Sequence, residues 1–227
     1  AGSIALKDNF PAQDAPMVHR LVEAGAVILG KTNLSEWANY RSTWSTSGWS
    51  GMGGLTRNPY DPRRTACGLV GTGVCAAAPS LGTVALASLL AGGALSLAAL
   101  TIGTETSGSV TCPAGMNGLV GIKPTIALVA RTGIIPISHN QDTAGPMTRT
   151  VADTAALLTY MAGSDASDPQ TAEADAHKTD YVKGLNKDAL KGARIGVMRF
   201  QKGYTPETQE VFEKALEALK AQGAELV

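Results

Sequence analysis

Gly103-Thr-Glu-Thr-Ser-Gly-Ser109 is a glycine-rich turn that carries a serine and follows the apolar run 97–102. Its glycines allow the backbone to turn tightly. Successive backbone N–H groups in such a turn can converge on one point and bind an anion. A serine hydroxyl beside these donors would supply the nucleophile and the oxyanion hole that acyl transfer requires. Taken alone, however, the segment is also typical of an ordinary loop.

The composition indicates a globular protein without a nucleic-acid partner. The chain has 227 residues, of which 44% are hydrophobic and 17% charged, and its formal net charge is zero. Nucleic-acid binding usually needs a basic patch, and no long basic block is present. Three scattered histidines offer no spacing for a structural metal site, so we expect none. Cys67, Cys75 and Cys112 are too few for a disulfide framework, and we expect inert buried thiols in a cytoplasmic chain.

Alternating helix and strand signals favour an α/β fold. Residues 14–25 have helical spacing and are followed by the short apolar run 26–29, which is typical of a buried strand. Residues 149–162 are expected to form a helix with Thr150 as its N-cap. Near the end, we expect a strand at 194–198, a helix at 205–222 opened by a proline, and a further strand from 225.

The apolar run 84–102 allows two interpretations. It spans 19 residues and contains no charge, so it is long enough to cross a bilayer. It lacks an aromatic belt, and glycine-rich turns flank it. We therefore favour a buried helix behind the turn and expect no membrane partner.

Residues 42–66 are rich in Ser, Gly, Thr, Asn and Pro and should form a long irregular loop. Loops of this length are uncommon unless they are functional. Ser45, Thr46 and Ser47 either line a substrate cleft or belong to a solvated surface, and the sequence leaves both open.

Several segments together resemble the amidase signature family, in particular its peptide-amidase-like members. They occur in the family's order and cover most of residues 3–165. They are Ala5-Leu-Lys-Asp-Asn9, 24–38, Ser45-Thr-Ser-Gly-Trp-Ser-Gly51, Arg57-Asn-Pro-Tyr60, 103–113, Asn117-Gly-Leu-Val-Gly-Ile-Lys-Pro-Thr125, Asp142-Thr-Ala-Gly-Pro-Met147 and Arg149-Thr-Val-Ala-Asp153. Residues 194–227 resemble the family's later strand–helix unit.

The resemblance implies an amide C–N hydrolase with a Ser–cis-Ser–Lys site and no cofactor or metal. Carried over by motif, Ser109 would be the nucleophile and Lys7 the lysine, which burial would hold in its neutral form. The oxyanion would rest on backbone N–H groups of the turn, namely those of Thr106, Ser107, Gly108 and Ser109. The substrate would be a small-molecule or peptide amide. The implied fold is a mixed twisted sheet flanked by helices on both faces.

One departure from the family pattern affects the chemistry. The bridging serine should lie in the segment Cys67-Gly-Leu-Val-Gly-Thr-Gly73, but Leu69 occupies its position. Because a leucine side chain can neither donate nor accept a proton, we expect impaired activity. The alternative is a non-catalytic remnant of the fold that uses its cleft for binding. The amide-hydrolysing component of a tRNA-dependent amidotransferase is a third interpretation, which segments 45–51 and 142–147 disfavour.

We expect one domain over residues 1–227. Its catalytic motifs lie within 1–165, residues 166–192 form a surface excursion, and residues 193–227 form the later strand–helix unit. Members of the family are longer than this chain, so we expect an incomplete domain. Missing pieces would expose sheet edges, which favours self-association.

Overall fold

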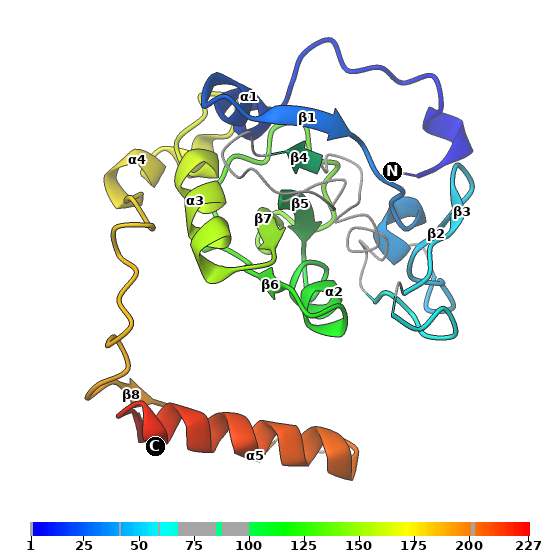
Figure 1. Cartoon of the computed structure of the whole chain (residues 1–227). Helices are drawn as coiled ribbons and strands as arrows, with labels where there is room; N and C mark the ends of the chain where they lie inside the picture. The colour runs from blue at the N-terminus through cyan, green and yellow to red at the C-terminus, as the bar shows by residue number, and fades with distance from the viewer. Residues whose placement is uncertain (1, 41, 59, 68–84, 88–99, 201–202) are drawn as a thin grey trace. The chain divides into compact units, whose positions relative to one another are not determined.

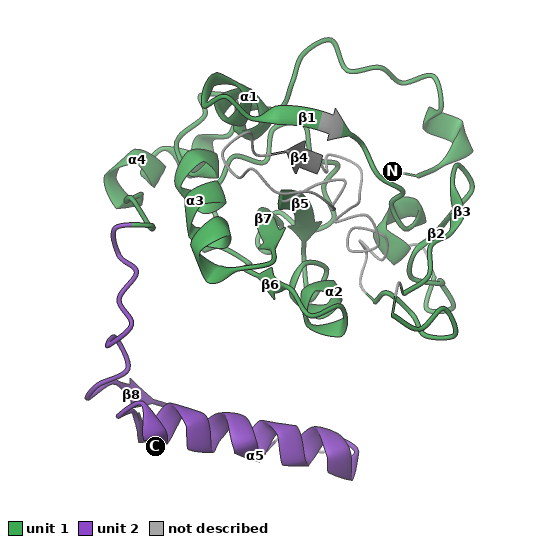
Figure 2. Ribbon diagram, in the orientation of Figure 1, with its two compact units in different colours: residues 1–182 green, residues 183–227 purple. Residues whose placement is uncertain are grey.

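The computed structural model describes residues 2–40, 42–58, 60–67, 85–87, 100–200 and 203–227. The chain divides into two compact units, Ala1–Val182 and Lys183–Val227, coloured separately in Figure 2. The boundary falls within the segment 166–192 that was expected to be a surface excursion. The expectation of a single domain stays a prediction.

A five-stranded sheet forms the centre of the first unit (Figure 1). Its order is β1-β4-β5-β7-β6, and every described pair in it is antiparallel. The strands are β1 (Val27–Gly30), β4 (Ala85–Ala87), β5 (Leu100–Glu105), β7 (Thr143–Thr148) and β6 (Val120–Gly121). A separate hairpin pairs β2 (Trp49–Ser50) with β3 (Gly54–Leu55). The α/β class is confirmed, and the described parallel pairing lies in the second unit.

The expected buried helix over 84–102 is wrong at both of its ends. Residues Ala85–Ala87 and Leu100–Glu105 are strands, and the residues between them lie outside the described part of the chain. β5 pairs with β7 along its whole length, from Leu100↔Thr148 to Glu105↔Thr143. The backbone groups of a short apolar run can be hydrogen-bonded in a helix or in a buried strand. The periodicity of apolar residues alone could not distinguish these two structures. Among the described residues, no helix has the length and apolar character needed to span a membrane.

Helices cover both faces of β7. Ala144 packs in a cluster with residues of α1 (Pro16–Glu23) and α3 (Val151–Met161). Met147 packs in a second cluster with Val110 and with α2 (Thr111–Met116). Because side chains alternate along a strand, residues 144 and 147 point to opposite faces. This arrangement places α2, and the turn before it, on the face away from α1 and α3.

The remaining elements follow their local sequence signals. The Thr150 side chain accepts a hydrogen bond from the Asp153 N–H at 3.1 Å, as an N-cap for α3 should. In the second unit, Thr205 caps α5 (Pro206–Ala221), and β8 (Arg194–Ile195) pairs in parallel with β9 (Glu225–Leu226). The short helices are η1 (Ile4–Leu6), η2 (Glu36–Asn39), η3 (Pro169–Thr171) and α4 (Ala174–His177).

Candidate active site

The turn between β5 and α2 is built around the carboxylate of Glu105. Its oxygens accept hydrogen bonds from the backbone N–H groups of Gly108 at 2.8 Å, Val110 at 2.6 Å and Thr111 at 2.8 Å. Glu105 is 4% exposed, and its bond to Val110 is buried, which strengthens that bond. The carboxylate thus ties the end of β5 to the first turn of α2. Sequence reasoning missed Glu105, although an acidic residue between two threonines in such a turn was a signal.

Ser109 is held inside this turn and is 1% exposed. It lies immediately before Val110, the N-cap of α2. Gly108 before it has φ +97°, a left-handed conformation that favours glycine. The placement suits a nucleophile at the start of a short helix.

The predicted oxyanion donors do not all remain available. The Gly108 N–H is donated to Glu105, so in this structure it does not serve an oxyanion. No acceptor is found among the described residues for the N–H groups of Thr106, Ser107 and Ser109. The oxyanion hole stays a prediction, now centred on these three groups.

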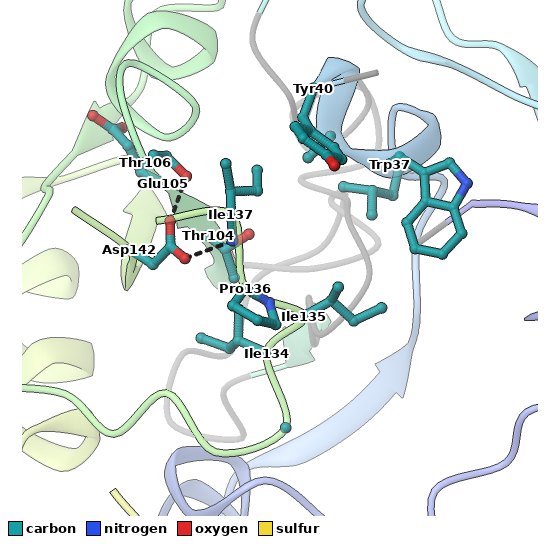
Figure 3. A pocket seen from close by; sticks show the side chains of 13 residues that line it. Trp37, Tyr40, Thr104, Glu105, Thr106, Ile134, Ile135, Pro136, Ile137 and Asp142 are labelled. Atoms are coloured by element: carbon teal, nitrogen blue, oxygen red, sulfur yellow. Dashed lines mark hydrogen bonds between the residues drawn. The ribbon is translucent and has the colours of Figure 1, made fainter. Parts of the chain in front are cut away.

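Asp142 joins the turn to a neighbouring loop (Figure 3). One carboxylate oxygen accepts a hydrogen bond from the Thr106 hydroxyl at 2.6 Å. The other accepts from the N–H groups of Ile137 at 2.8 Å and Ser138 at 2.9 Å. Asp142 is 6% exposed and precedes β7 directly. At the level of sequence, this residue was only part of a family motif and had no assigned role.

A pocket of about 320 Å³ opens beside the turn. Most of its wall is apolar, and none of the described residues that line it is basic. The lining residues are Leu34, Trp37, Ala38, Tyr40, Thr104, Glu105, Thr106, Gly133, Ile134, Ile135, Pro136, Ile137 and Asp142. In Figure 3, Ile134 to Ile137 form one side, with Tyr40 and Trp37 across from them. A pocket of this size and polarity accepts a small apolar group.

Lys7 is not brought to this pocket. It follows η1 and is exposed, so the burial expected for a neutral lysine base is absent. The segment around η1 is instead tied to the β2–β3 hairpin, where the Met52 N–H donates to the Gly2 carbonyl at 3.2 Å. Leu69, the position of the missing bridging serine, lies outside the described residues. The lysine and bridging roles therefore stay predictions.

The candidate cleft residues of the long loop line a different hollow. Ser45 and Thr46 border an open depression of about 440 Å³ together with Trp37, Trp44 and Trp49. The Ser47 hydroxyl accepts a hydrogen bond from the Asn39 side chain at 3.0 Å. Their part in substrate binding stays a prediction.

The expectation of inert thiols is wrong for two cysteines. Cys67 and Cys112 form a disulfide, with their Cα atoms 6.0 Å apart. They are 45 residues apart in sequence. A residue next to Cys67 also contacts the end of α2, since the Asn117 side chain donates to the Ala66 carbonyl at 3.0 Å. Counting cysteines could not show which two of the three lie close enough to pair. Cys75 lies outside the described residues.

Comparisons with known proteins find similar sequences and structures for the whole chain. A family model described as Amidase matches residues 1–227. A relative from Arthroderma benhamiae, named as an amidase, is 41% identical over 100% of this chain and 36% of its own length. A component of the glutamyl-tRNA(Gln) amidotransferase of Synechococcus sp. is 36% identical over 99% of this chain and 42% of its own length. The native peptide amidase of Stenotrophomonas maltophilia matches with a TM-score of 0.83 and 45% identity, over 100% of this chain and 43% of that chain. The chain thus spans less than half the length of these relatives.

Proposed function

Because this chain belongs to the amidase signature family, we propose that it hydrolyses the C–N bond of linear carboxamides, with Ser109 as the nucleophile. The observation that carries the proposal is the buried Ser109 in a turn ordered by Glu105. The adjoining apolar pocket supports it, because an acyl group must lie beside the attacked carbonyl. The 45% identical peptide amidase makes peptide amides the first substrates to test.

The chemistry follows from the positions in the turn. The Ser109 Oγ bonds to the amide carbon while its proton passes to a base, and the carbonyl oxygen becomes an oxyanion. Backbone N–H groups of Thr106, Ser107 and Ser109 would stabilise that oxyanion. The C–N bond then breaks, and the leaving nitrogen takes up the proton. Water attacks the acyl-serine, releasing the carboxylic acid and restoring the hydroxyl.

We assign the role of the base to Lys7 because of its place in the family motif. We also propose that the activity of this chain is impaired. Lys7 is exposed and does not line the described pocket beside the turn, so its role as the base rests on the motif alone. Leu69 supplies no hydroxyl to bridge the gap. A serine-protease site without its full triad still accelerates the reaction by roughly 10³- to 10⁴-fold over water. We expect a residual acceleration of this order for this chain.

Labelling with a fluorophosphonate and mass spectrometry tests the nucleophile. The adduct should map to Ser109, and Ser109→Ala should abolish both the adduct and ammonia release from an amidated dipeptide. Leu69→Ser should raise the release rate by on the order of 10²-fold, because it restores a proton-transfer group. A folded protein with no adduct at Ser109 would contradict the proposal.

A non-catalytic binding role is the second candidate, and the exposed Lys7 favours it. In that case the chain would bind amides in its pocket without releasing ammonia. Unchanged amide binding by Ser109→Ala, together with no turnover in the parent chain, would support this candidate. Turnover that Ser109→Ala abolishes would exclude it.

A further inference from the structure

We call residues 105–111, which carry Ser109, the catalytic turn, and residues 134–138, which border the pocket, its wall. Among the described residues, Asp142 is the only one whose side chain is hydrogen-bonded to both. Its contact with the turn is the Thr106 hydroxyl, and its contact with the wall is the backbone at Ile137 and Ser138. The loop is closed behind these bonds, because the Asp142 N–H donates to the Ser138 carbonyl at 2.9 Å. The carboxylate therefore fixes the loop from two directions.

The wall held in this way is aliphatic. Ile134, Ile135, Pro136 and Ile137 line the pocket from this loop (Figure 3). The two carboxylates that reach the pocket, Glu105 and Asp142, already accept hydrogen bonds from backbone N–H groups. Among the residues that the structure describes, no lysine, arginine or histidine belongs to the lining. A negatively charged group entering this space would lose its hydration without gaining a positively charged partner among the described lining residues.

We propose that Asp142 is a positioning residue, which holds the 134–138 loop against the catalytic turn and thereby selects uncharged, apolar acyl groups. The selection of acyl groups for reaction rests on the proposed amide hydrolysis. The preference for uncharged, apolar amides in equilibrium binding does not. The distance between the aliphatic wall and Thr106 is set by one carboxylate that bonds to both sides. Loss of that carboxylate leaves two N–H groups without their acceptor and lets the wall move away from the turn.

Two variants separate positioning from folding. Asp142→Ala removes both carboxylate oxygens, which accept hydrogen bonds from Thr106, Ile137 and Ser138. Asp142→Asn keeps the link, since its amide oxygen can accept from Ile137 and Ser138 while its NH₂ group donates to the Thr106 hydroxyl. Asp153→Asn is the matched control, because Asp153 is a carboxylate of α3 that does not line the pocket. Circular dichroism and thermal unfolding check that each variant is folded.

Equilibrium binding is the first readout, because it does not depend on turnover. Hexanamide and the charged amide succinamate are titrated against the protein by isothermal calorimetry. The parent chain should prefer hexanamide, and Asp142→Ala should lower that preference by on the order of tenfold, the size expected for one misplaced apolar contact. Asp142→Asn and Asp153→Asn should keep it. A preference unchanged in Asp142→Ala, or no hexanamide binding by the parent chain, would overturn the inference.

Labelling of Ser109 is the second readout. A short-chain and a long-chain alkyl fluorophosphonate are compared, and Asp142→Ala should reduce the long-to-short rate ratio. Equal slowing of both probes would indicate a purely structural role and would overturn the inference. If the parent chain binds hexanamide selectively but is not labelled, the proposed hydrolysis fails and the positioning role stands on the binding data.

Discussion

The Glu105 carboxylate accepts a hydrogen bond from the backbone N–H of Val110 at 2.6 Å. This bond joins the last residue of β5 to the N-cap of α2. Ser109 lies between these two residues and is 1% exposed. The same carboxylate bonds to Gly108 and Thr111, so a single side chain organises the whole turn. The position of the candidate nucleophile Ser109 thus depends on Glu105, which forms no covalent bond in the proposed reaction.

Glu105→Ala should therefore lower both stability and the reactivity of Ser109. The substitution leaves three buried or half-buried N–H groups without their acceptor, which should cost about 3 kcal/mol in the free energy of unfolding. Urea unfolding followed by circular dichroism measures this cost, and fluorophosphonate labelling measures the reactivity. Glu105→Gln keeps one accepting oxygen and should lie between the parent chain and Glu105→Ala. Labelling at the parent rate in a folded Glu105→Ala would show that the turn does not need this carboxylate.

The disulfide should contribute measurably to stability. It links Cys67 to Cys112 in the first turn of α2. Reduction should lower the free energy of unfolding by about 2 to 4 kcal/mol, chiefly because the cross-link restricts the unfolded chain. Unfolding is measured with and without dithiothreitol. The double variant Cys67→Ala/Cys112→Ala is the control, and its stability should not respond to the reductant. Equal stability of the oxidised and reduced parent chain would contradict the expectation.

Thr150 offers a test of local helix stabilisation. Its hydroxyl accepts the Asp153 N–H at the start of α3, and α3 packs against the sheet with five buried residues. Thr150→Ala should cost about 1 kcal/mol in the free energy of unfolding, whereas Thr150→Ser keeps the accepting oxygen and should cost much less. Thermal unfolding of the pair measures the difference. Equal losses in both variants would point to the methyl group rather than to the cap.

Elements with their own local signals were predictable from the sequence. The helix 151–161 has its N-cap threonine at 150, and the helix 206–221 has a threonine and a proline at its start. Such signals act within one turn, so neighbouring elements do not change them. The run 84–102 carries no such signal. Its strand β4 pairs with β1 and β5, and β5 pairs with β7, which is more than 35 residues away in sequence. Apolar composition alone could not supply that partner.

The candidate site was predictable to a similar degree. Ser109 and its turn are specified by adjacent residues, and the structure keeps them together with Thr106 and Glu105. The contribution of Asp142 was not predictable, because its hydroxyl partner lies 36 residues earlier in the chain. Lys7 belongs to a segment whose position depends on long-range packing, and the structure leaves it exposed. The order of the turn depends on adjacent residues, whereas the placement of Asp142 and Lys7 depends on distant segments. The catalytic roles of Ser109, Lys7 and Leu69 stay predictions.

Asp168 and Arg131 should make stability depend on acid pH. The guanidinium Nη2 lies 2.6 Å from Asp168 Oδ1, and the two side chains are 12% and 7% exposed for Arg131 and Asp168 respectively. The side-chain hydrogen bond from Arg131 holds the pKa of Asp168 below its ordinary value. Because the folded pKa is lowered, the stabilisation is present above the unfolded pKa of about 3.9 and is lost as the pH falls through the folded value.

Asp168→Asn should therefore lower the free energy of unfolding at pH 6 by about 3 kcal/mol, because it leaves the arginine charge without its partner. The difference from the parent chain should shrink as the pH falls below about 4, because Asp168 of the unfolded parent chain takes up a proton before Asp168 of the folded chain does. Urea unfolding at a series of pH values between 6 and 3 measures it. Glu23→Gln is the control, because it removes an exposed contact with His19 on α1 and should change stability by less than about 1 kcal/mol. A difference between Asp168→Asn and the parent chain that stays constant over this range would show that the pair does not govern the acid transition.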